Sequence, residues 1–200
     1  NQKKKISTQV IVMIPVFILG IVSVFSNMLA MSSLRSVNSV ATVIAEESIA
    51  SVSELASIEQ ETMQIHNLAL SHIVATDLNT MISVVANIRE QESVLEDELA
   101  QYKKYVDAET QSDYDVICEN YEQLKYECGN VMAYSAAGDN EAAYQLANGD
   151  ISTYASAIES SIATIKDKVN ANADKERKNL QTTYHVSFVT CVVTILVSVF

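Results

Sequence analysis

The chain carries a long repeat of apolar residues at alternating spacings of three and four. The repeat occupies four segments, residues 34–69, 78–106, 114–131 and 151–169. Side chains three and four positions apart lie on one face of an α-helix, so each segment predicts a helix with a buried face. A repeat sustained over so many turns is typical of helices that pack in a bundle at shallow crossing angles. The sequence therefore predicts an all-α fold.

The breaks between these segments coincide with residues suited to helix ends. These residues are Thr76 and Asp77, then Thr110 and Ser112, then Gly138, Asp139 and Asn140. Ser, Thr, Asp and Asn accept hydrogen bonds from the first amides of a helix, and Gly closes a helix C-terminus. Asn148, Gly149 and Asp150 predict a kink or restart inside the last helix. Together the breaks predict an up-down-up-down four-helix bundle.

Both ends of the chain are apolar, because residues 6–34 and residues 179–200 contain no charged side chain. A hydrocarbon core of about 30 Å needs about 20 apolar residues in a helix. We expect two transmembrane helices, residues 9–31 and 184–200, continuous with the first and last bundle helices. For the first, a cleaved signal peptide is the alternative, although its apolar region would be only about 7–15 residues long.

A cluster of three lysines at residues 3–5 sets the expected orientation, since the nearest basic residue beyond the first span is Arg35. Basic residues stay preferentially on the cytoplasmic side. We therefore expect residues 1–8 to form a cytoplasmic tip and residues 32–183 to form an extracytoplasmic domain. The second span stops while it is still apolar, so we expect it to be truncated at Phe200 and a cytoplasmic output domain to follow.

The charge balance excludes several classes of protein. There are 25 acidic and 13 basic residues, and every acidic residue lies between Glu46 and Glu176. A chain that is 48% hydrophobic with four glycines and one proline is neither a disordered tail nor a turn-rich β-sandwich. Its acidic middle argues against binding to nucleic acid.

Three stretches of sequence resemble a known family. They are VATDLNTM at residues 74–81, YSAAGDNEAAYQLANGD at residues 134–150 and IKDKVNANADKER at residues 165–177. Together with the two spans and the bundle, they are similar to the sensory half of a bacterial methyl-accepting chemotaxis protein. The resemblance covers essentially the whole chain.

This resemblance implies a homodimeric receptor in the bacterial cytoplasmic membrane, crossing it more than once. Its external bundle would detect a small molecule or a binding protein, and a small displacement of the fourth helix would pass through the second span to a cytoplasmic signalling domain. It implies chemotaxis and signal transduction without enzymatic activity.

The first bundle helix has a second seam beside its main apolar stripe, again with spacings of four and three. The seam residues are Ala45, Ile49, Val52, Ala56, Glu59, Met63, His66, Leu70 and Ile73. A spare seam suggests contact with a partner subunit. The alternative is a single wide apolar face, because both seams together cover only about 160° of the helix. The family resemblance favours the dimer.

Glu59 and His66 interrupt this seam one heptad apart, with Met63 between them. At a two-fold axis they would occur twice and could bind a cationic or hydrogen-bonding ligand, or titrate near neutral pH. We include Tyr154 of the fourth helix in the same candidate ligand site. The alternative is that Glu59 and His66 lie at the bundle edge with their polar ends in water.

The class of ligand follows from the arginines and lysines that are missing. In members of the family that sense amino acids, arginines of the first helix hold the ligand carboxylate. Here residues 36–88 contain no Lys or Arg. We therefore expect a neutral or cationic small molecule, or an extracytoplasmic binding protein.

We expect no metal, cofactor or catalytic residue. His66 and His72 are six residues apart, which places them about 240° apart around a helix. No metal-binding or nucleophile motif occurs, and Cys118 and Cys128 are too far apart on one helix to form a disulfide. Two rival functions remain open. The same sensor could serve a histidine kinase or cyclic-dinucleotide synthase, or the bundle could be a membrane tether without signalling.

Overall fold

The computed structural model describes residues 8–199, and every regular element among them is a helix. The elements in chain order are α1 (Thr8–Thr42), a π-helical segment (Val43–Ser48), α2 (Ile49–Val74), α3 (Leu78–Tyr102), a 3-10 turn (Lys103–Tyr105), α4 (Gln111–Ala136), α5 (Asn140–Leu146), a second π-helical segment (Ala147–Ile151) and α6 (Ser152–Val199). The predicted tip, residues 1–8, lies outside the described residues except for Thr8, and so does Phe200. The all-α prediction is confirmed.

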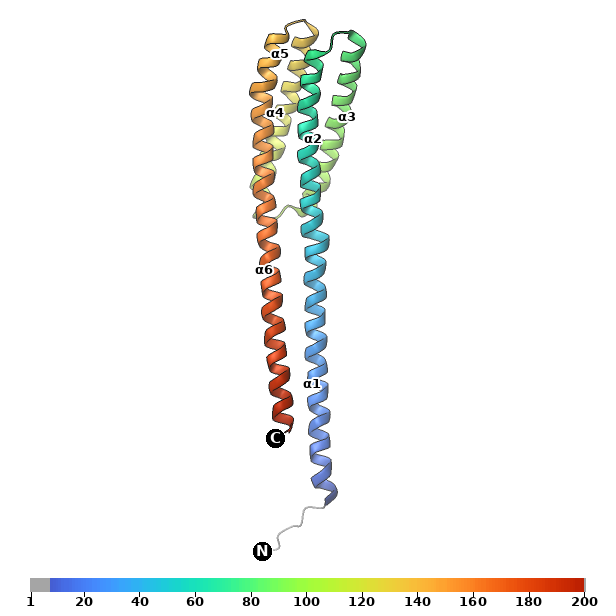
Figure 1. The fold of residues 1–200 in the computed structure, drawn as a ribbon, viewed down its shortest axis with the longest axis vertical. Coiled ribbons are helices and arrows are strands. Elements are labelled where there is room, and N and C mark those ends of the chain that lie inside the picture. The colour runs from blue at the N-terminus through green and yellow to red at the C-terminus, as the bar shows by residue number, and fades with distance from the viewer. Residues whose placement is uncertain (1–7, 200) are drawn as a thin grey trace. The chain divides into compact units, whose positions relative to one another are not determined.

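The chain divides into two compact units, Ala45–Asn172 and a second one made of Asn1–Ile44 with Ala173–Phe200. The first unit is the bundle. Its four helices are α2, α3, α4 and a fourth that consists of α5, the second π-helical segment and the first part of α6. Within this unit the helices lie side by side and reverse direction at each connection (Figure 1). The predicted four-helix bundle is confirmed.

The heptad repeat builds the core of the bundle. Along α2 and α4 the predicted positions are buried: Ser51, Leu55, Ile58, Thr62, Ile65 and Ala69, then Tyr114, Ile117, Tyr121, Leu124, Cys128 and Val131. Residues of α3 and α6 join them in one apolar cluster. Leu78, predicted to begin the α3 stripe, is instead exposed, because it stands in the first turn of α3 at the end of the bundle.

The start of α3 is capped as predicted, whereas the start of α4 differs in detail. The carboxylate of Asp77 accepts hydrogen bonds from the amide and the hydroxyl of Thr80, at 3.0 and 2.6 Å, and these bonds hold the pKa of Asp77 below its usual value. Thr110 is the residue before α4, but its hydroxyl bonds to Asp107 and does not cap the helix. Ser112 lies inside α4.

The connection between α4 and α5 follows the prediction. Gly138 has a φ of +82°, a left-handed conformation that side chains with a Cβ rarely adopt, and it closes α4. The carboxylate of Asp139 then accepts the amide N–H of Ala142 at 3.1 Å and caps α5. The predicted kink at residues 148–150 is a widened π-helical turn within a helix that continues.

The second unit contains α1 and the C-terminal part of α6. One helical stretch of the described residues, Val12–Val74, is long and apolar enough to cross a membrane, with a window of 18 residues whose mean hydropathy is 2.2. Within the unit, Ser26 Oγ and Cys191 Sγ lie 3.2 Å apart, which joins α1 to α6.

Candidate functional site

A groove of about 490 Å³ follows the outward face of α2. Its lining residues are Ala56, Glu59, Gln60, Met63, Gln64, Asn67, Leu68 and Ser71. Gln60 and Asn67 are each nine residues from a buried residue of α2, Ala69 and Ile58 respectively. At about 100° per residue, this places them about 180° around the helix from the core. The groove therefore belongs to the side of α2 that the bundle leaves uncovered.

The groove offers mainly hydrogen-bonding groups. Three side-chain amides, one hydroxyl and one carboxylate line it, beside the thioether of Met63, which is 49% exposed. Amides both donate and accept hydrogen bonds, and a thioether packs adaptably against irregular apolar groups. This chemistry suits a neutral polar molecule or another helix better than it suits a strongly charged ligand.

Glu59 has a cationic partner within the chain. Its Oε2 accepts a hydrogen bond from Nζ of Lys166 on α6, at 2.6 Å. The pair links the edge of the groove on α2 to α6. A cationic ligand at Glu59 would therefore compete with Lys166 for the carboxylate.

The other predicted ligand residues are placed differently. Met63 lines the groove with Glu59, but His66 and Tyr154 are not among its lining residues. His66 is half-buried, and its Nε2 is buried without a hydrogen-bond partner. Tyr154 is half-buried on α6 and packs against the main core. The structure thus brings together two of the four predicted residues.

The second seam of α2 is open toward its N-terminal end and buried toward its C-terminal end. Ile49 is 62% exposed, whereas Ile73 is 7% exposed and Leu70 packs against the core. Near Ile73 the two seams of α2 are therefore parts of one wide apolar face that packs on the bundle core. The exposed part, from Ile49 to Met63, overlaps the groove and is available to a partner.

Sequence reasoning missed the polar residues of the groove. Gln60, Gln64, Asn67 and Ser71 recur at spacings of four, three and four, which places them on one helix face. Polar residues on an exposed helix face usually indicate only contact with solvent, so apolar spacing does not reveal them. A search for amide side chains at helical spacing would have found this stripe.

A carboxyl and an imidazole side chain are buried inside the bundle. Glu92 on α3 is 3% exposed; its Oε2 accepts a hydrogen bond from Arg89 at 3.1 Å, and its Oε1 has no partner. Burial raises the pKa of Glu92, against the opposing effect of Arg89 and Lys125. His72 is 2% exposed, its Nδ1 has no partner, and burial lowers its pKa. Each is a buried polar group that folding leaves incompletely satisfied.

No metal-binding arrangement occurs among the side chains that the structure describes. A small cleft of about 150 Å³ between α2 and α3 is acidic, with Glu54 and Glu98 among its lining residues. Even so, no group of three or more His, Cys, Asp or Glu side chains in the described part of the chain is arranged to hold a metal ion. The three cysteines are free thiols, and Cys128 is buried in the core as its position in the repeat predicted.

Comparison with known families yields a match that covers most of the chain. A family model described as a four helix bundle sensory module for signal transduction matches residues 3–184. No curated protein matches the chain. The matched range contains the whole bundle and both π-helical segments.

Proposed function

The chain belongs to the family of four-helix-bundle sensory modules for signal transduction, and we propose that it is the sensing part of a bacterial chemotaxis receptor. In this role it binds a ligand outside the cytoplasmic membrane and acts through a change of helix position, without catalysis. The observation that carries the proposal is the ion pair between Glu59 and Lys166. It connects the groove on α2 to the helix that leads out of the bundle.

The proposed membrane topology rests on the sequence and on α1. Val12–Val74 includes a segment apolar enough to cross a bilayer. The apolar residues 184–200 are proposed as a second span, and the lysines at residues 3–5 support a cytoplasmic N-terminus. The bundle then lies outside the cytoplasmic membrane, where it meets external solutes.

The proposed mechanism uses the continuity of α6. This helix runs from Ser152 to Val199 without a break, so it can carry a displacement from the bundle toward the proposed second span. A ligand in the groove contacts the residues around Glu59 and so changes the strength of its bond to Lys166. A ligand that favours one position of α6 shifts the population, with a coupling energy of typically about 1–3 kcal/mol.

We propose that a second copy of the chain completes the site. The groove lies on a single helix and is open, and a two-fold axis along α2 would close it with the same residues of the partner. The amides could then bind a neutral polar molecule from both sides. A binding protein docked on the same face is the alternative occupant.

A thermal-shift screen of the full chain in lipid nanodiscs tests this function. Neutral, cationic and carboxylate metabolites are screened separately, and we expect a neutral compound to raise the unfolding midpoint. Gln64→Leu should abolish that shift. Gln123→Leu is the matched control, because Gln123 is also an exposed glutamine but lies on α4.

Three outcomes are distinguishable. A shift that is lost only in Gln64→Leu supports the groove as the ligand site. A shift that survives Gln64→Leu keeps the receptor but contradicts this site. If no compound of any class stabilises a folded chain, direct detection of a small molecule is wrong, and a binding protein or a tether without signalling replaces it.

A further inference from the structure

The connection between α3 and α4, residues 103–110, is bonded to α2. Lys104 Nζ lies 2.9 Å from Glu54 Oε1, and the Tyr105 hydroxyl donates to the same oxygen at 3.3 Å. Just before the connection, the buried hydroxyl of Tyr102 lies 3.0 Å from Ser51 Oγ. These contacts anchor one side of the connection to the first turns of α2.

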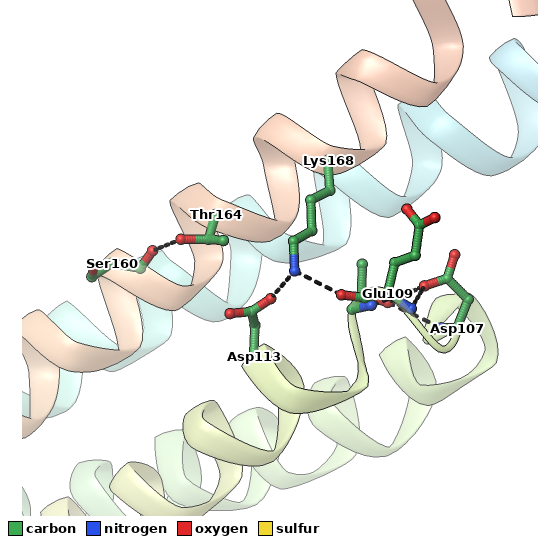
Figure 2. A network of polar contacts seen from close by, with 7 residues as sticks. Asp107, Glu109, Asp113, Ser160, Thr164 and Lys168 are labelled. Carbon is green, nitrogen blue, oxygen red and sulfur yellow. Dashed lines mark hydrogen bonds and ion pairs between the residues drawn. The ribbon is translucent and has the colours of Figure 1, made fainter. Parts of the chain in front are cut away.

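Hydrogen bonds within the connection make its second half rigid. Asp107 Oδ1 accepts hydrogen bonds from the amides of Glu109 and Thr110 and from the Thr110 hydroxyl, each at 2.9 Å. The same hydroxyl accepts the amide N–H of Asp107 at 3.0 Å. Figure 2 shows this network beside α6. Because each of these hydrogen bonds joins two residues of the segment 107–110, we expect the segment to move as one rigid unit.

One side chain of α6, Lys168, forms a hydrogen bond to this segment. Lys168 Nζ donates to the carbonyl oxygen of Glu109 and to Asp113 Oδ2 on α4, both at 2.6 Å (Figure 2). Among the side chains that the structure describes, no other hydrogen bond joins α6 to residues 103–113. By hydrogen bonds of the described side chains, the connection is thus anchored to α2 at several points and to α6 through Lys168.

Lys166 and Lys168 hold α6 from two directions. They are two residues apart, which at about 100° per residue separates them by about 200° around the helix. Lys166 binds Glu59 on α2, whereas Lys168 binds Asp113 on α4. A displacement of α6 along its axis by about 1–2 Å, typical of helix shifts in switching proteins, would lengthen and weaken both 2.6 Å bonds.

We infer that the α3–α4 connection is a clasp that fixes the position of α6 against α2, and that Lys168 is the positioning residue at which the clasp releases. This inference rests on the proposed function, in which displacement of α6 is the signal. The side chains of Lys168 and Asp113 are 37% and 23% exposed, so water screens their attraction. A bond of this kind shifts the equilibrium between two positions of α6 only a fewfold. Such a weak bond suits a contact that must break when α6 moves.

The test measures the position of α6 directly in the full chain. Spin labels are attached at Glu119→Cys on α4 and Asn172→Cys on α6, two exposed positions of the bundle unit, with the three native cysteines replaced. Distance distributions are recorded by pulsed electron paramagnetic resonance in lipid nanodiscs. We expect Lys168→Met to shift or broaden the distribution by about 1–2 Å.

Two further variants separate positioning from loss of structure. Lys168→Arg keeps a charged donor and should restore the original distribution, whereas Lys175→Met removes an exposed lysine elsewhere on α6 and should leave it unchanged. The thermal midpoint of Lys168→Met should stay close to that of the parent chain. An unchanged distribution in Lys168→Met overturns the clasp, and so does a change that Lys168→Arg fails to reverse.

The distance measurement needs neither ligand nor signalling output. If the ligand screen fails while Lys168→Met moves α6, the clasp stands and direct detection of a small molecule is wrong. If the screen succeeds while α6 does not move, the receptor stands and the clasp is wrong.

Discussion

Lys166 on α6 and Glu59 on α2 form a 2.6 Å hydrogen bond across 107 positions of sequence. Their side chains are 23% and 37% exposed, so the pair lies at the edge of the bundle and outside its core. A partly exposed ion pair contributes little to stability, but this one joins the groove-bearing helix to the helix that leaves the bundle. We therefore expect the pair to affect the position of α6 relative to α2 more than the free energy of unfolding.

The strength of this pair can be measured with a double-mutant cycle on Glu59→Gln and Lys166→Met. We expect a coupling energy of about 0.2–1 kcal/mol, because both side chains are partly solvated. The free energy of unfolding is measured by urea titration of the chain in detergent micelles. Salt at 1 M should reduce the coupling, and Glu119→Gln, an exposed control on α4, should show none with Lys166→Met. A coupling above about 3 kcal/mol would contradict the exposed geometry.

Glu92 should make the bundle less stable at neutral pH than an apolar residue would. Burial raises the pKa of its carboxyl above the usual 4.5. The folded state therefore holds the proton more tightly than the unfolded state does, and stability falls as the pH rises from 4.5 through the folded-state pKa. We expect Glu92→Leu to be neutral or stabilising at pH 7, by about 0–2 kcal/mol, and to remove that pH dependence. Urea titrations between pH 4 and pH 8 check this. Strong destabilisation by Glu92→Leu would show that the Arg89 pair matters more than desolvation.

His72 should act on stability in the opposite sense. Burial lowers its pKa below the usual 6.5, so the unfolded state takes up a proton before the folded state does. Stability is then fully present above pH 6.5 and is lost as the pH falls from 6.5 through the folded-state pKa. We expect His72→Leu to flatten this acid-side slope, whereas Ser71→Ala, an exposed neighbour, should keep it. Thermal midpoints of both variants are measured from pH 5 to pH 8. If the midpoint depends on pH equally steeply in both variants, His72 is not the source of the acid-side loss of stability.

Two glycines of the same region should respond to alanine with opposite signs. Neither has an atom near the position of an added Cβ, so steric clashes do not contribute. Gly138 has a φ of +82°, and alanine there should cost about 1–2 kcal/mol. Gly129 lies inside α4, where alanine should stabilise by about 0.5–1 kcal/mol. Urea titration of both variants tests the pair, and a loss of stability in Gly129→Ala would contradict it.

The sequence predicted the bundle because heptad spacing reports which face of each helix is buried. Leu55 and Leu124 stand where the repeat placed them, and Asp77 caps the helix that it was expected to cap. Spacing along one helix does not report which residues of two helices face each other. For that reason spacing does not predict the partnership of Glu59 with Lys166. It also places His66 and Tyr154 in one candidate ligand site with Glu59 and Met63, although neither lines the groove that Glu59 and Met63 share.

The outward face of α2 should mediate self-association of the chain. A two-fold axis along α2 would bring each exposed polar residue near its copy, so a new charge on this face would meet a like charge. We expect Gln64→Glu to raise the dissociation constant of the dimer about tenfold, since facing like charges are costly in an interface. Gln123→Glu makes the same chemical change on the exposed face of α4 and should have no effect. Sedimentation velocity in detergent micelles compares the two variants. Because both replace an exposed glutamine on a bundle helix, equal dissociation constants would place the dimer contact on another face of the bundle.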